Sequence, residues 1–262
     1  MEPDLVEDTK RKATLTTIVA TLTILSTLSV VYLPFEKASA SLPAHLGLVQ
    51  EGNGQDIKHH ILFKDDYSSN AGWTQIGNSV TVNSPSFPGI VKWNNEMGEG
   101  GAGDDRVYKQ LPTALPSHKW TVYFDYKFTA SSLVRSWIFD LSATSADPWL
   151  LTSHDIITVE HGFEADQLVV ERGPRGDASA GIPISPNTQY YVKLERAQTQ
   201  LVLSVFTDPT RTVNVSGSPV TLDIAQTDYN GDLKFIQHAG CSACGPSRTL
   251  TAQLDNTLIT LP

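Results

Sequence analysis

The fold is decided by one stretch of the sequence, WTVYFDYKF, which occupies Trp120–Phe128. Large apolar side chains fall on every second residue and polar ones alternate with them. This is the period of a β-strand with one face on a core and the other toward solvent. We therefore predict a strand in a sheet that packs on one side only, with Phe124 on the inner face and Tyr123 and Asp125 on the outer face.

Similar short patterns continue from residue 61, separated by clusters of Gly, Pro, Asn and Asp, and no window there sustains a helical period for three turns. Three residues separate the runs 190–196 and 200–206, which predicts an antiparallel hairpin. In the run 136–141 we expect Trp137 and Phe139 on one face and Ile138 and Asp140 on the other. The further predicted strands are 61–65, 79–82, 90–93, 106–110, 156–161, 167–171, 220–224, 233–237 and 249–255.

So many short strands about ten residues apart predict one all-β domain, an antiparallel β-sandwich over residues 61–262. The composition supports a packed core, since 40% of the 262 residues are hydrophobic. The formal charge is −9, and apart from Lys10-Arg11-Lys12 the basic residues are scattered singly. A chain of this kind lacks the basic surface that binds phosphate backbones, so we exclude nucleic acid as a partner.

The first forty residues predict an export segment. A basic cluster, Lys10-Arg11-Lys12, precedes an uncharged run over 13–35, and Ala38-Ser39-Ala40 has the small residues of a signal-peptide cleavage site. We expect residues 1–40 to form an apolar export helix that is removed after Ala40. The alternative is a retained membrane anchor over 13–35, because about 20 apolar residues span a bilayer. In both cases residues 41–60, a polar leader, and the β-domain are delivered outside, either secreted or on the cell surface.

The two cysteines, Cys241 and Cys244, are too few for a disulfide framework. In an exported protein we expect them to form a local disulfide that closes one tight loop. The alternative is a zinc site that also uses His238, which would need a fourth ligand from elsewhere.

Several segments resemble the concanavalin A-like lectin/glucanase domains, the jelly-roll group that includes laminin G-like modules and legume lectins. Residues 63–68, FKDDYS, followed by Trp73, resemble the opening strand, and 120–128 the central strand. The runs 190–196 and 200–206 look like the paired late strands, and 254–259 like the closing strand that returns beside the first. The resemblance covers about residues 61–260. It implies the fold but no single activity, because the group ranges from lectins and adhesion modules to glycoside hydrolases.

The resemblance also implies a structural Ca²⁺ ion where the first and last strands meet. Asp65, Asp66 and Asp255 lie at the matching positions, and Ca²⁺ takes six to eight oxygen ligands. The alternative is that these aspartates only stabilise turns.

Recognition of a sugar requires an aromatic face for the ring and polar groups for the hydroxyls. The candidate ligand-binding residues are Tyr123, Asp125, Asp140, Trp149 and His154. Trp149 follows a loop sequence, and Asp125 and Asp140 are expected to face each other across neighbouring strands.

Catalysis is not expected. The hydrolases that this chain resembles carry E-x-D-x-E or E-x-D-x-x-E on one strand, which sets two carboxylates close together for glycoside cleavage. The nearest match begins at Glu164 and Asp166, but Leu168 and Val169 occupy the positions of the third acid. We predict a non-catalytic binding or adhesion module whose partner is a glycan, a cell-envelope polymer or another surface protein. The alternatives are a structural component of a surface layer or extracellular assembly, and a glycoside hydrolase of the same fold.

Overall fold

A computed structural model describes residues 60–97, 105–132, 135–162, 165–173, 176–229, 232–240 and 249–262. These residues belong to one compact unit, Gly47–Pro262. The predicted signal peptide or anchor and most of the polar leader lie outside the described residues, as do Cys241 and Cys244. Within the described part of the chain, no helix is long and apolar enough to cross a membrane.

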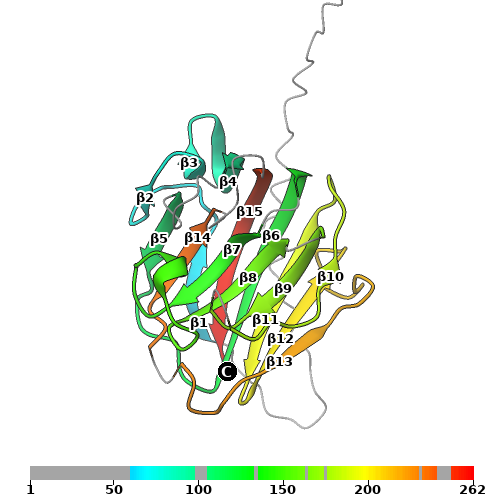
Figure 1. The fold of residues 1–262 in the computed structure, drawn as a ribbon. Coiled ribbons are helices and arrows are strands. Elements are labelled where there is room, and N and C mark those ends of the chain that lie inside the picture. The colour runs from blue at the N-terminus through cyan, green and yellow to red at the C-terminus, as the bar shows by residue number, and fades with distance from the viewer. Residues whose placement is uncertain are drawn as a thin grey trace, which may run out of the picture. The chain divides into compact units, whose positions relative to one another are not determined.

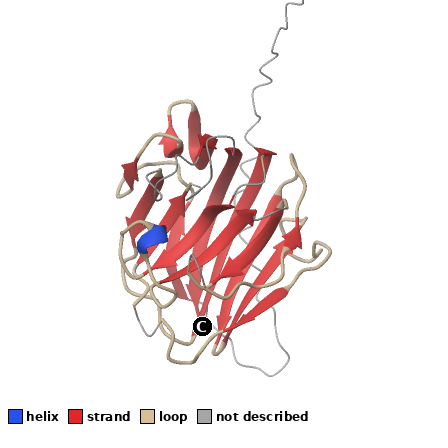
Figure 2. Ribbon diagram, in the orientation of Figure 1, coloured by secondary structure: helices blue, strands red, loops and turns tan. Residues whose placement is uncertain are grey.

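The described residues form two antiparallel sheets that lie one behind the other in Figure 1. Strands make up nearly all of the regular structure, with one 3-10 turn, η1 (Pro148–Leu150), drawn in blue in Figure 2. Sheet A has the order β13 (Val220–Asp223), β12 (Gln200–Phe206), β11 (Tyr190–Ala197), β6 (Lys119–Ser131), β15 (Thr249–Leu261), β4 (Phe87–Met97) and β3 (Val80–Ser84), and β1 (His60–Asp65) also pairs with β15. Sheet B has the order β10 (Ile182–Pro183), β9 (Gln167–Glu171), β8 (Ile156–Gly162), β7 (Arg135–Ser142), β14 (Phe235–Ala239), β5 (Arg106–Gln110) and β2 (Thr74–Ile76).

The core lies between the two sheets, as the alternating pattern of β6 predicts. The inner side chains of β6 are all at most 2% exposed, and they are Trp120, Val122, Phe124, Tyr126 and Phe128. The ring of Phe124 stacks on Phe139 of β7, with centroids 5.0 Å apart and planes 9° from parallel. This contact joins the two sheets and confirms which face of each strand is buried.

The closing strand ties the ends of the described domain together. β15 pairs with β6 along one edge, and its other edge pairs with β4 and then with β1. Phe63 of β1 lies opposite Ile259 of β15, so the last strand returns beside the first, as the sequence comparison implied.

Two local predictions are wrong in detail. The hairpin between β11 and β12 has a two-residue connection rather than three, because Ala197 pairs with Gln200 and Gln198 takes a left-handed conformation with φ 57°. In β7 the ladder shifts register between Trp137 and Phe139. This bulge places Ile138 with Phe139 in the core cluster and leaves Trp137 outside it.

Candidate functional site

A row of four polar side chains crosses the outer face of sheet B, and we call it the polar row. Gln237 of β14 lies opposite Asp140 of β7, Asp140 lies opposite Thr158 of β8, and Thr158 lies opposite Glu171 of β9. Neighbours on each strand belong to the core cluster, so the row points away from the core; they are Phe139, Leu141, Ile157, Val159, Val170 and Ile236. All four side chains are nevertheless buried, with at most 3% of their surface exposed.

Much of the polar row has no hydrogen-bonding partner among the described residues. Both carboxylate oxygens of Asp140, the hydroxyl of Thr158 and Oε1 of Gln237 are unpartnered. The amide nitrogen of Gln237 donates to the hydroxyl of Ser142 at 2.8 Å and to the carbonyls of Thr144 and Ala146, both at 3.1 Å, which fixes the orientation of its oxygen. Each buried acceptor without a partner lowers the stability of the folded state by about 1–3 kcal/mol, unless a ligand or water donates a hydrogen bond to it.

Two buried glutamates, Glu160 beside the polar row and Glu171 within it, bind the same arginine. Arg135 of β7 donates from Nε to Glu160 of β8 at 2.8 Å, and from Nη2 to both oxygens of Glu171 at 2.6 and 2.5 Å. Burial raises the pKa of Glu160 to about 8, against the opposing effect of Arg135, and Glu171 adds to the rise. Burial also raises the pKa of Asp140 well above its usual range, with further contributions from Glu160, Glu171 and Asp147.

Two tryptophans lie on the same side of sheet B. The bulge in β7 directs Trp137 to this face, opposite Glu160, and its ring centroid is 6.1 Å from that of Trp149 in η1. Asp147 accepts a hydrogen bond from the backbone nitrogen of Trp149 at 2.9 Å and thereby holds the turn. The loop 143–155 that carries η1 lies in front of sheet B in Figure 2. Aromatic faces and buried polar groups therefore occur together on this face.

Sequence reasoning placed Asp140 and Trp149 in a binding site, and both belong to this face. It missed Glu160, Glu171, Arg135 and Gln237. One signal was present, because Thr158 and Glu160 place polar side chains on one face of the strand Ile156–Gly162. The cross-strand register that aligns them with Asp140 is not visible in any single segment.

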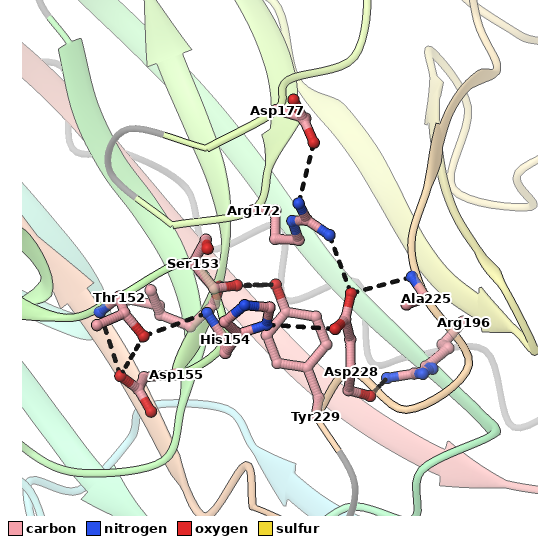
Figure 3. Close-up of polar contacts among 11 residues, drawn as sticks. Thr152, Ser153, His154, Asp155, Arg172, Asp177, Arg196, Ala225, Asp228 and Tyr229 are labelled. Carbon is pink, nitrogen blue, oxygen red and sulfur yellow. Dashed lines mark hydrogen bonds and ion pairs between the residues drawn. The ribbon is translucent and has the colours of Figure 1, made fainter.

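His154 does not join the polar row. Its Nδ1 lies 3.2 Å from Asp228 Oδ1, and the other carboxylate oxygen of Asp228 accepts from Arg172 at 3.0 Å (Figure 3). Arg196 donates to the Asp228 carbonyl at 2.7 Å, and the Tyr229 hydroxyl donates to the Ser153 carbonyl, also at 2.7 Å. This cluster connects the loop 143–155 to the segment that follows β13, which is a structural role.

Tyr123 and Asp125 lie on the outer face of sheet A, so the expectation that Asp125 and Asp140 face each other is wrong. β6 and β7 belong to different sheets, and because Phe124 and Phe139 meet in the core, the side chains next to them point outward in opposite directions. Arg211 donates to Asp125 at 3.0 Å and lies over the ring of Tyr123, 5.2 Å from its centroid.

The remaining contacts of Asp125 are also within the protein. Asn256 donates to its second carboxylate oxygen at 2.9 Å, and the guanidinium of Arg211 is 5.7 Å from the ring centroid of Tyr191. Burial raises the pKa of Asp125, while Asn256 and Arg211 oppose the rise. Both oxygens of this carboxylate are therefore occupied by partners from the protein itself.

The three predicted calcium ligands do not form one ligand set. Asp65 accepts from Lys109 at 2.9 Å and from the indole nitrogen of Trp73 at 3.0 Å, so a lysine already supplies its positive charge. Asp66 accepts from Ser68 in a local turn. No group of three or more His, Cys, Asp or Glu side chains within the described ranges is arranged to hold a metal ion. These aspartates therefore do not fit the predicted calcium site.

His238 faces the core. Its Nε2 lies 3.0 Å from the Tyr67 hydroxyl and its Nδ1 lies 2.9 Å from the Ile138 carbonyl oxygen. Burial lowers its pKa to about 4. Because both ring nitrogens have partners in the core, His238 does not fit the alternative of a zinc site with the two cysteines.

Comparisons with known proteins identify the fold. No family model matches the sequence, and no curated protein matches it. Among solved structures, the winged bean acidic lectin complexed with methyl-α-D-galactose is 9% identical, covers 78% of this chain and 98% of its own, and has a TM-score of 0.53. The calcium- and mannose-bound exoplasmic/lumenal domain of VIP36 is 9% identical, with 76% and 91% coverage and a TM-score of 0.50.

A third match is the GH43 protein BlXynB from Bacillus licheniformis, which is 11% identical, with 76% of this chain and 39% of that chain covered and a TM-score of 0.51. At such identities the likeness shows the fold alone. The chain therefore has the concanavalin A-like jelly-roll fold, as the sequence predicted.

Proposed function

We propose that the protein is a non-catalytic glycan-binding module, secreted or on the cell surface, whose binding site is the outer face of sheet B. One observation carries the proposal. The buried polar row has unpartnered acceptors at Asp140, Thr158 and Gln237, on the same face as Trp149, whose half-buried indole lies beside the fully buried Trp137. Sugar hydroxyls supply the donors that these acceptors lack, and indole faces pack against sugar rings.

Two further facts favour this function. Lectins that carry bound sugars in their solved structures share the fold. The extracellular location is supported by the predicted export segment over residues 1–40 and by the similarity to the exoplasmic/lumenal domain of VIP36.

A glycan array followed by calorimetric titration of the best ligand tests the proposal. Trp149→Ala should weaken binding at least tenfold, about 1.4 kcal/mol, because one stacking face is lost. Tyr123→Ala is the matched control, since it removes an aromatic side chain from the outer face of sheet A. A loss of binding in Tyr123→Ala with none in Trp149→Ala would move the site to sheet A, and an array without any bound glycan would refute the function.

A second candidate function is glycoside hydrolysis, which a specific observation favours. A general acid must hold its proton near the working pH, and Glu160, with a pKa raised to about 8, meets that requirement. Glu171, which accepts two hydrogen bonds from Arg135, would act as the base or nucleophile. Release of reducing sugar that disappears in Glu160→Gln, with binding retained, would establish hydrolysis. Bound glycans that remain intact would leave binding as the function.

A further inference from the structure

We infer that Asn214, on the loop between β12 and β13, is the acceptor of an N-linked glycan. The inference goes beyond the proposed function, because it concerns a sugar that the protein carries rather than one that it binds. It stands on two independent observations: an acceptor motif in the sequence, and the way in which the structure presents the side chain of Asn214.

The sequence around Asn214 is an N-glycosylation motif. Asn214-Val215-Ser216 fits N-x-[ST] with a residue other than proline in the middle, and no other asparagine of the chain stands two residues before a serine or threonine. Such motifs are glycosylated in secreted proteins. Both interpretations of residues 1–40, a cleaved signal peptide and a retained anchor, deliver the domain that carries Asn214 outside.

The structure holds Asn214 in a short extended segment beside the end of β12. Asn214 forms an isolated antiparallel bridge with Phe206. Next to this bridge, the backbone nitrogen of Val215 donates to the Val205 carbonyl at 2.8 Å. These contacts fix the backbone on both sides of the Asn214 side chain, which is exposed. The acceptor is therefore presented to solvent by a segment that is anchored to sheet A.

The motif continues into a tight turn. The backbone nitrogen of Ser218 donates to the Val215 carbonyl at 3.0 Å, so Ser216 and Gly217 are the two central residues of a four-residue turn. Gly217 has φ 85°, which glycine adopts readily at the third position of a turn and other residues do not. Ser216 is exposed, as Asn214 is. Both functional positions of the motif therefore lie on an exposed loop, where additions to the chain are tolerated.

The Asn214 side chain has its amide nitrogen available for the sugar. Among the described residues, the hydrogen bond of this side chain is the one that Oδ1 accepts from the Ser218 hydroxyl, at 3.3 Å. N-glycosylation joins the sugar to Nδ2 and leaves Oδ1 as an acceptor. The folded loop can therefore carry a glycan without losing this contact and without displacing a buried side chain.

The reaction needs a glycosyl donor, and the class that fits is a lipid-linked oligosaccharide phosphate. A bond forms between Nδ2 of Asn214 and the anomeric carbon of the first sugar, while the bond from that carbon to the phosphate oxygen breaks. Nδ2 loses one proton to solvent, and the lipid phosphate leaves. Nothing is oxidised or reduced, and the side chain remains an amide.

Intact mass and peptide mapping of the native protein test the inference. Protein isolated from the organism that makes it should be heavier than its polypeptide by a whole number of monosaccharide residues. Peptide mapping should place that increment on Asn214. An unmodified Asn214 overturns the inference and leaves the proposed function in place, because the glycan array tests sheet B separately.

Three variants produced in the same organism test whether the motif directs the modification. Asn214→Gln and Ser216→Ala should both lose the mass increment, because each removes an essential position of the motif. Ser216→Thr is the matched control and should keep the increment. All three should give the circular dichroism spectrum of the wild type, because both side chains are exposed. An increment that survives Asn214→Gln but not Ser216→Ala would place the sugar on Ser216 and overturn the inference.

Discussion

Replacing Glu160 by glutamine should make the protein more stable at alkaline pH. Glu160 is 1% exposed, and its ionised form must share Arg135 with Glu171 in a buried setting. Glutamine keeps the shape and the acceptor oxygen that faces Arg135, but it carries no charge at any pH. The variant therefore isolates the free energy that ionisation of this one carboxyl group costs the folded state.

The magnitude follows from the pKa, which rises from an ordinary value of 4.5 to about 8 in the folded protein. A group whose pKa is raised on folding contributes stability below its unfolded pKa, and that contribution is lost as pH rises through the folded value. One pKa unit corresponds to about 1.4 kcal/mol, so between about pH 5 and 8 the wild type should lose on the order of 4 kcal/mol relative to the variant.

Denaturant titrations of both proteins at several pH values between about 5 and 8 measure this difference. The free energies of unfolding should be similar at the acidic end and should diverge as pH rises, with the variant more stable. Asp255, whose pKa burial raises to about 7, also titrates in this range, but it is present in both proteins and cancels in the comparison. Parallel profiles would refute the reasoning, since they would mean that Glu160 stays ionised in the folded protein throughout.

Three more outcomes are expected. Phe124→Ala should lower the free energy of unfolding by about 3–5 kcal/mol, because the ring is buried against Phe139. Tyr123→Ala should lower it by only about 1 kcal/mol. Equal losses in denaturant titration would mean that the inner and outer faces are wrongly assigned. Asp255→Asn should raise the melting temperature at about pH 8, because burial and neighbouring aspartates raise the pKa of Asp255 to about 7. If the substitution lowers the melting temperature only when calcium is present, Asp255 is a calcium ligand as the sequence predicts. Intact mass of the native protein should begin at Ser41, and a mass that includes residues 1–40 would indicate a retained anchor.

The sequence predicts the sandwich well because alternation is a local property of each strand. The strands 106–110, 167–171 and 200–206 were predicted with the bounds that the structure has. β2 and β10 were missed because three and two residues are too short to show a period. The bulge that redirects Trp137 was missed for a different reason, since a register shift depends on the partner strand and leaves no mark on the alternation itself.

The candidate site was only partly predictable for a related reason. Trp149 and Asp140 were selected as single residues of suitable chemistry, and both lie on the outer face of sheet B. Tyr123 and Asp125 were grouped with them because β6 and β7 are consecutive in the chain, and consecutive strands are commonly neighbours in a sheet. Here the chain passes from sheet A to sheet B between them, so residues close in sequence lie on opposite outer faces.

A comparison of the two outward-facing aspartates explains why sheet B carries the functional proposal. Asp125 has Arg211 on one carboxylate oxygen and Asn256 on the other, so that carboxylate is already satisfied by the protein. Asp140 is more deeply buried and has a partner on neither oxygen among the described residues. A fold gains nothing in stability from a buried acid in that condition, since an apolar residue of similar size would cost less. Under the proposed function, the donors of a bound sugar complete this carboxyl group, and for that reason the proposal is placed on sheet B rather than on sheet A.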